Sequence, residues 1–144
     1  MWKYLNAYAY SLFGPAVKYG DCHLEDAKVL LRDFIDKADQ VIAGKDQTAA
    51  TLRFGHDANI IPLVSLMEVG IAAERVEVKE VTGHWNISLV SPMAANLQMI
   101  FVRNRKNEVK VRVLYNEKDA GLPIEGAPFY DWTVLRSYLV GKCQ

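Results

Sequence analysis

The sequence has little cysteine and no net charge, and each of these absences excludes a class of protein. Its two cysteines, Cys22 and Cys143, are far apart and form neither a CxxC pair nor a metal-ligand spacing, so no metal site is predicted. A disulfide between them and two free thiols are both open. Seventeen basic residues balance seventeen acidic ones, which leaves no strong field to attract nucleic acid or an anionic membrane.

Long apolar runs are also missing. No stretch reaches the roughly 18 apolar residues that a membrane-spanning helix needs. Residues 1–20 lack a basic region, a continuous apolar run and a small-residue cleavage site, so they do not resemble a signal peptide. The composition is 51% hydrophobic and 24% charged, which is typical of a globular chain with a core. A chain of 144 residues fits a single domain or a fragment of a larger one.

Apolar side chains recur at helical spacing in four segments, which are residues 2–13, 24–43, 60–67 and 130–140. Gly14 and Gly44 follow the first two and are expected to end them. Tyr19–Asp21 is expected to form a turn, with Asp21 capping the second helix. The first helix has one aromatic face, which needs a partner to cover it. That face consists of Tyr4, Tyr8, Tyr10 and Phe13.

Strand signals alternate with these helices. Residues 49–55 are predicted to form a short buried strand, and residues 76–81 an edge strand. Residues 96–103 and 108–116 are predicted to pair as a late β-hairpin. The mixture of helices and strands indicates an α/β fold. The three tryptophans, Trp2, Trp85 and Trp132, are expected in the core.

One polar cluster lies between the strand predicted at 49–55 and the helix that follows it. His56, Asp57 and Asn59 occupy this turn, where α/β proteins commonly bind ligands. A helix amino terminus attracts anions, and a histidine there can donate a hydrogen bond to phosphate. A neighbouring phosphate favours the protonated form of Asp57, which could then act as a general acid. On spacing alone, capping by Asp57 or Asn59 and a structural His56 are the better interpretation.

A resemblance to a known family favours the catalytic interpretation of these residues instead. Arg53-Phe54-Gly55-His56-Asp57, followed by Ala58-Asn59 and an apolar helix, resembles the carboxyl-terminal signature of the histidine acid phosphatases. This branch of the histidine phosphatase superfamily includes phytases and multiple inositol polyphosphate phosphatases. Residues 36–39, 91–98, 115–117 and 128–132 are also similar to bacterial members. The resemblance implies the carboxyl-terminal portion of a phosphoglycerate-mutase-like α/β sandwich.

The resemblance also implies a chemistry. In the family, a histidine in an amino-terminal Arg-His-Gly-x-Arg-x-Pro motif attacks phosphorus. His56 would contact the phosphate, Asp57 would protonate the leaving oxygen, and Asn59 would be a further substrate contact. The ligand would be a phosphomonoester or inorganic phosphate, without a cofactor or metal. His-Asp is closer to the phytase and general acid phosphatase pattern than to the His-Ala-Glu of the inositol polyphosphate phosphatases. The resemblance alone suggests a periplasmic or secreted protein.

The family nucleophile is absent from these 144 residues. No Arg-His-Gly occurs, and His23 and His84 lack flanking arginines. We therefore expect residues 1–144 to be the carboxyl-terminal part of such an enzyme and to be inactive, or nearly so, in isolation. The expected partner is the missing amino-terminal half or a second copy of the chain.

The alternative is a non-enzymatic α/β module that binds an anion or a protein partner through the aromatic face of residues 2–13. The basic hairpin around residues 103–110 is expected to be a solvated edge rather than a nucleic-acid site.

Overall fold

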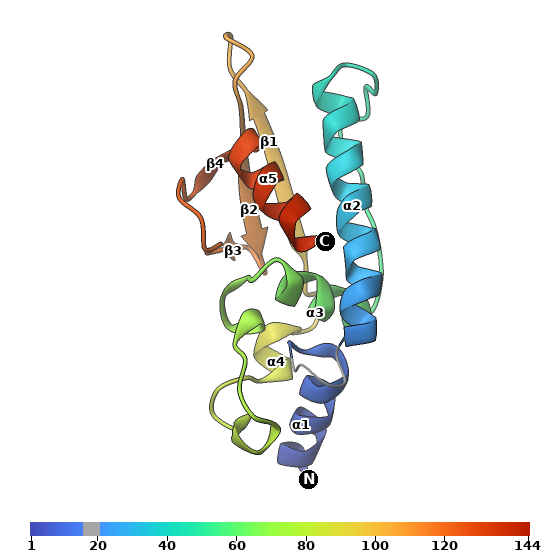
Figure 1. The fold of residues 1–144 in the computed structure, drawn as a ribbon, viewed down its shortest axis with the longest axis vertical. Coiled ribbons are helices and arrows are strands. Elements are labelled where there is room, and N and C mark those ends of the chain that lie inside the picture. Colours follow the sequence, from blue (N-terminus) through green and yellow to red (C-terminus); the bar gives the residue numbers. More distant parts are fainter. Residues whose placement is uncertain (16–20) are drawn as a thin grey trace.

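The computed structural model describes residues 1–15 and 21–144 and contains helices and an antiparallel sheet (Figure 1). The helices are α1 (Trp2–Phe13), α2 (Asp21–Ile42), α3 (Asp57–Leu66), α4 (Ile87–Val90) and α5 (Trp132–Lys142), with short 3-10 helices η1 (Gly70–Ala73) and η2 (Val78–Glu80). The strands are β1 (Leu97–Arg103), β2 (Val109–Tyr115), β3 (Lys118–Asp119) and β4 (Phe129–Asp131). The expected mixture of helices and strands is confirmed.

The two amino-terminal helices form where the sequence predicts them, but the single aromatic face expected on α1 is wrong. Tyr10 is buried and Phe13 packs against the core, whereas Tyr4 and Tyr8 are exposed on the opposite side. The bounds of α1 agree with residues 2–13, and α2 begins three residues earlier than expected, at Asp21. Gly44 has a φ of +71° and Lys45 N donates to Gln40 O at 2.9 Å, which closes the end of α2 as predicted. Most of the turn expected at residues 19–21, and the side chains of Asp21 and Cys22, lie outside the described residues.

The predicted hairpin is confirmed. β1 and β2 pair antiparallel with Ile100 opposite Arg112, and both β3 and β4 also pair with β2. Helix α5 covers one face of this sheet, where Val111 and Tyr130 are buried. β1 pairs with no other strand in the described part of the chain, and Ile100 is 43% exposed. β1 is therefore an apolar edge strand.

The strand predicted at residues 49–55 is wrong. This segment leads down alongside α2 without regular secondary structure (Figure 1), and its side chains are exposed, Leu52 by 78% and Phe54 by 95%. Its residues favour a strand, but a strand also requires a neighbour that accepts its backbone hydrogen bonds. No strand among the described residues is paired with it.

The edge strand predicted at residues 76–81 is also wrong. Val78–Glu80 is a 3-10 helix, and the backbone of Val76 is bonded to a side chain instead of a strand. Val76 N donates to the Tyr10 hydroxyl at 2.7 Å, and that hydroxyl lies 2.9 Å from Val76 O. A buried tyrosine therefore satisfies the backbone groups that a neighbouring strand would otherwise have paired.

The core lies between the helices and beneath α5. Trp85 and Trp132 are buried as predicted, with 0% and 5% of their surface exposed. Trp2 was expected there too, but it is 53% exposed at the first turn of α1. Helix α2 supplies a continuous inward stripe and packs against α1, α3 and α5, so it holds the two ends of the molecule together (Figure 1). The stripe consists of Ala27, Leu31, Ile35 and Ala38.

Candidate functional site

The predicted site lies at the amino terminus of α3. The helix begins at Asp57, and His56 precedes it in an extended conformation with φ −109° and ψ 173°. Ala58 and Asn59 are therefore helical rather than part of the turn. Pro62 lies in the interior of α3, where it cannot donate a hydrogen bond to the carbonyl of Ala58.

Asn59 has a contact that accounts for this early start. Its Oδ1 accepts the backbone N–H of His56 at 3.2 Å, while the His56 carbonyl accepts Asn59 N at 2.9 Å. A Cβ at Gly55 would lie 3.2 Å from the same Oδ1, so Gly55 leaves room for the amide. Capping by Asn59 was one of the interpretations that the spacing favoured, and an amide three residues after a helix cap is a known signal. Asn59 thus fixes the backbone that carries His56 and Asp57.

Asp57 lies against the free end of the helix. Its Oδ1 accepts the backbone N–H of Ala58 at 2.8 Å. The first N–H groups of a helix have no preceding carbonyls and carry a partial positive charge, so the carboxylate lies where an external anion would bind. Both His56 and Asp57 are exposed, and they face solvent.

Arg53 does not point at this helix end. Its guanidinium pairs with Asp33 and lies 4.6 Å from the centre of the Phe34 ring, both on α2. These contacts attach the extended segment before His56 to the middle of α2. They also neutralise the positive charge that is nearest to His56 in sequence.

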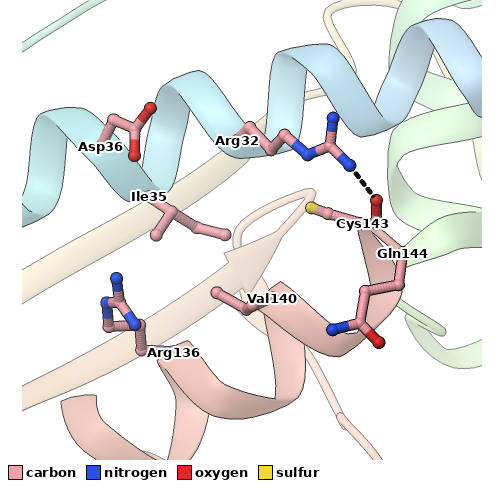
Figure 2. Close-up of a pocket in the computed structure, with 7 residues that line it drawn as sticks. All are labelled: Arg32, Ile35, Asp36, Arg136, Val140, Cys143 and Gln144. Carbon is pink, nitrogen blue, oxygen red and sulfur yellow. Dashed lines mark hydrogen bonds between the residues drawn. The ribbon is translucent and has the colours of Figure 1, made fainter.

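A hollow lies elsewhere, between α2 and α5. Figure 2 shows Arg32, Ile35 and Asp36 on one side of it, facing Arg136 and Val140 on the other. Its volume is about 150 Å³. Arg136 Nε is 2.8 Å from Asp39 Oδ2, so that charge is already balanced. Another open hollow lies beside Glu68, Arg75 and Pro123. Neither is lined by His56 or Asp57.

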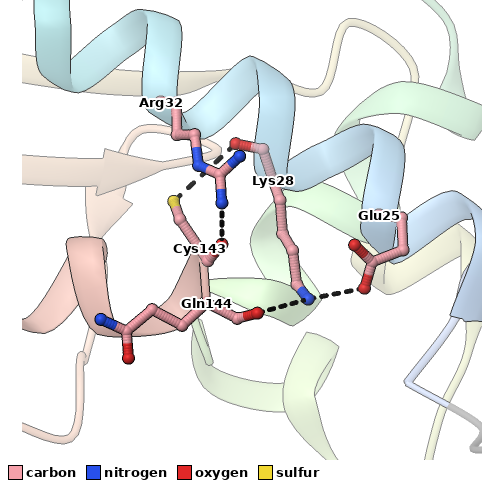
Figure 3. Close-up of polar contacts among 5 residues, drawn as sticks. All are labelled: Glu25, Lys28, Arg32, Cys143 and Gln144. Atoms are coloured by element: carbon pink, nitrogen blue, oxygen red, sulfur yellow. Dashed lines mark hydrogen bonds and ion pairs between the residues drawn. The ribbon is translucent and has the colours of Figure 1, made fainter.

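The polar contacts at the first hollow hold the end of the chain on α2. Figure 3 shows Arg32 donating to the carbonyl of Cys143 and Lys28 Nζ at 3.4 Å from Gln144 O. Cys143 is buried and is a free thiol. Burial raises the pKa of the Cys143 thiol above its ordinary value, despite the opposing charge of Arg32. A buried neutral thiol is a poor nucleophile, so these groups are structural.

The two remaining histidines, His23 and His84, have structural contacts. The His23 ring packs edge-on against Phe13, with 5.2 Å between ring centres. His84 Nδ1 lies 2.8 Å from Glu74 Oε1. Across residues 1–15 and 21–144, no group of three acidic, histidine or cysteine side chains could hold a metal ion. No helix of the described chain is long and apolar enough to span a bilayer.

Replacing Asn59 tests the geometry of the helix start. Asn59→Ala removes the acceptor for the His56 N–H, and we expect it to lower the free energy of unfolding by about 1 kcal/mol. Asn59→Asp retains an acceptor and adds a favourable negative charge at the helix amino terminus, so its stability should stay near wild type. Urea unfolding of both variants measures the difference. Equal losses in the two variants would contradict a capping role.

No protein-family model matches the chain, and no curated protein matches it. Support for a function therefore comes from the residues of this chain and their arrangement.

Proposed function

We propose that this chain supplies the proton-donating part of a phosphomonoester hydrolase of the histidine acid phosphatase type. His56 contacts the phosphate, and Asp57 protonates the leaving oxygen. The nucleophile comes from a separate amino-terminal region that carries Arg-His-Gly. The fold is then the carboxyl-terminal portion of a phosphoglycerate-mutase-like α/β sandwich.

The observation that carries this proposal is the position of His56 and Asp57 at the free end of α3. The side chain of Asp57 lies 2.8 Å from a first-turn N–H group, which is a position that favours an anion. A phosphate bound there would replace the carboxylate at the helix end and repel its negative charge. That repulsion favours the protonated carboxyl, which is the form that a general acid requires.

Two exposed segments with strand-forming sequences support the proposal that this chain needs a partner. Residues 49–55 lead directly to His56, yet Leu52 and Phe54 are largely exposed. The edge strand β1 is apolar over most of its length and carries one charged residue, Arg103. Both segments are attached to α2, the first through Arg53 and Asp33 and the second through Arg103 and the Ile42 carbonyl. Exposed edges of this kind pair readily with further strands, which an amino-terminal half would supply.

The second candidate function is a module that binds a protein partner without catalysis. It is favoured by α1, on which Trp2, Tyr4 and Tyr8 are 53%, 82% and 64% exposed. An aromatic surface of this kind is typical of an interface. It does not account for the arrangement of His56, Asp57 and Asn59, so we place it second.

The isolated chain should not turn over a phosphomonoester. Without a nucleophile and its arginines, only residual catalysis is expected, and hydrolysis of glycerol phosphate should be indistinguishable from buffer. A purified sample assayed at acid pH, with Asp57→Ala as the matched control, measures this. Hydrolysis at the rate of a complete enzyme, abolished in Asp57→Ala, would contradict the division of the site between two regions.

A further inference from the structure

The inward face of α1 is fully occupied. Asn6 is 4% exposed, and its side chain donates to Trp85 O at 2.7 Å and accepts from Ile87 N at 2.9 Å. Tyr10 is fully buried, and its ring centre lies 5.3 Å from that of Trp85 in an edge-on arrangement. These contacts fix the orientation of α1 on the body of the protein, so its outward face is held in one position.

The outward face is a second apolar stripe. Met1, Leu5, Tyr8 and Leu12 follow one another at spacings of four, three and four residues, which is the pattern of a seam between two packed helices. Met1 is 96% exposed, Leu5 53% and Tyr8 64%. Trp2 and Tyr4 border the stripe. A helix that is apolar on both sides is normally covered on both, and the spacing favours another helix as the cover.

We propose that this cover is α1 of a second copy of the chain, packed antiparallel. Lys3 is the one charged residue between Trp2 and Phe13. A strongly charged partner would therefore find almost no charges to pair with on this surface. In the antiparallel arrangement the two Lys3 side chains lie at opposite ends and the two helix dipoles oppose each other favourably. Leu5 of each copy then faces Tyr8 of the other, and Met1 faces Leu12.

The exposed apolar area of α1 limits how tightly two copies of the chain can associate. An aromatic side chain covers about 200 Å², so the exposed fractions of Trp2, Tyr4 and Tyr8 correspond to roughly 400 Å². Met1 and Leu5 bring the total to about 600 Å² per copy, against about 800 Å² per partner in a stable complex. The dimer is therefore weak, with a dissociation constant on the order of 100 µM.

Sedimentation velocity across that concentration range tests the proposal. Wild type should shift from monomer to dimer, and Leu5→Lys and Tyr8→Glu should each remain monomeric, because a charge would be buried against an apolar residue. Val134→Lys, at a position that is 49% exposed on α5, is the matched control and should dimerise. Circular dichroism verifies that all four proteins are folded.

A mixture of Leu5→Lys with Tyr8→Glu tests the orientation. In the antiparallel arrangement the lysine introduced in one variant meets the glutamate introduced in the other, so the mixture should regain a dimer. A monomeric wild type, a dimer that survives both substitutions, or a mixture that stays monomeric would overturn the proposal. So would a wild type that binds phosphatidylcholine vesicles through Tyr8 without dimerising. None of these outcomes bears on phosphate chemistry, so the proposed function is tested separately.

Discussion

Asp57→Asn is expected to slow the hydrolysis of glycerol phosphate by about 10²- to 10⁴-fold once an Arg-His-Gly region completes the site. The leaving alkoxide is a strong base, and it departs readily only if a proton is delivered as the phosphorus–oxygen bond breaks. An asparagine has nearly the same shape as Asp57 and cannot deliver one. The experiment requires a protein in which an amino-terminal half that carries the motif is joined to this chain.

The choice of substrate makes this test specific for proton donation. The leaving group of p-nitrophenyl phosphate departs without protonation, so Asp57→Asn should slow its hydrolysis far less than that of glycerol phosphate. Asp26→Asn, at an exposed position in the first turns of α2, is the matched control and should leave both rates unchanged. Equal losses on the two substrates would indicate a role for Asp57 in binding or folding rather than as an acid.

Leu31→Ala should have the largest effect on stability. Leu31 is fully buried in the stripe by which α2 packs against its neighbours, and its truncation leaves a cavity. Substitutions of this kind cost about 2–5 kcal/mol, a large part of the roughly 5–15 kcal/mol that stabilises a typical domain. Because α2 packs directly against α3, the same loss loosens the support of the candidate site.

Val29 offers the control for that experiment. It lies on the same helix but is 65% exposed, so Val29→Ala should change the free energy of unfolding by less than about 0.5 kcal/mol. Urea unfolding monitored by circular dichroism measures both variants. A Leu31→Ala protein as stable as Val29→Ala would show that α2 is not part of the core.

The parts of the fold that the sequence predicted are those decided by local spacing. The periodicity of α1 and α2, the stop at Gly44 and the β1–β2 hairpin all depend on residues that are close together in the chain. Residues 49–55 and 76–81 were mispredicted because a strand depends on partners that local sequence does not reveal. For Val76 that partner is a tyrosine side chain 66 residues away.

The site was predicted less completely than the helices. The sequence placed His56 and Asp57 in a turn between a strand and a helix beginning at residue 60, whereas no strand precedes them and the helix begins at Asp57. Capping by Asn59 was an interpretation that spacing alone favoured, but the sequence did not predict that its amide would accept the His56 N–H, with α3 beginning at Asp57 despite Pro62 in its interior. Nor did it predict that Arg53 points toward α2, because the contact with Asp33 spans 20 residues.

Titration of the chain with inorganic phosphate, followed through its backbone amide NMR signals, tests most directly whether the start of α3 is a phosphate site. We predict saturable shifts confined to residues 56–60, with millimolar affinity, that vanish in His56→Ala and persist in His84→Ala. Phosphate that leaves those amides unchanged, or that shifts them equally in His56→Ala, would contradict the assignment.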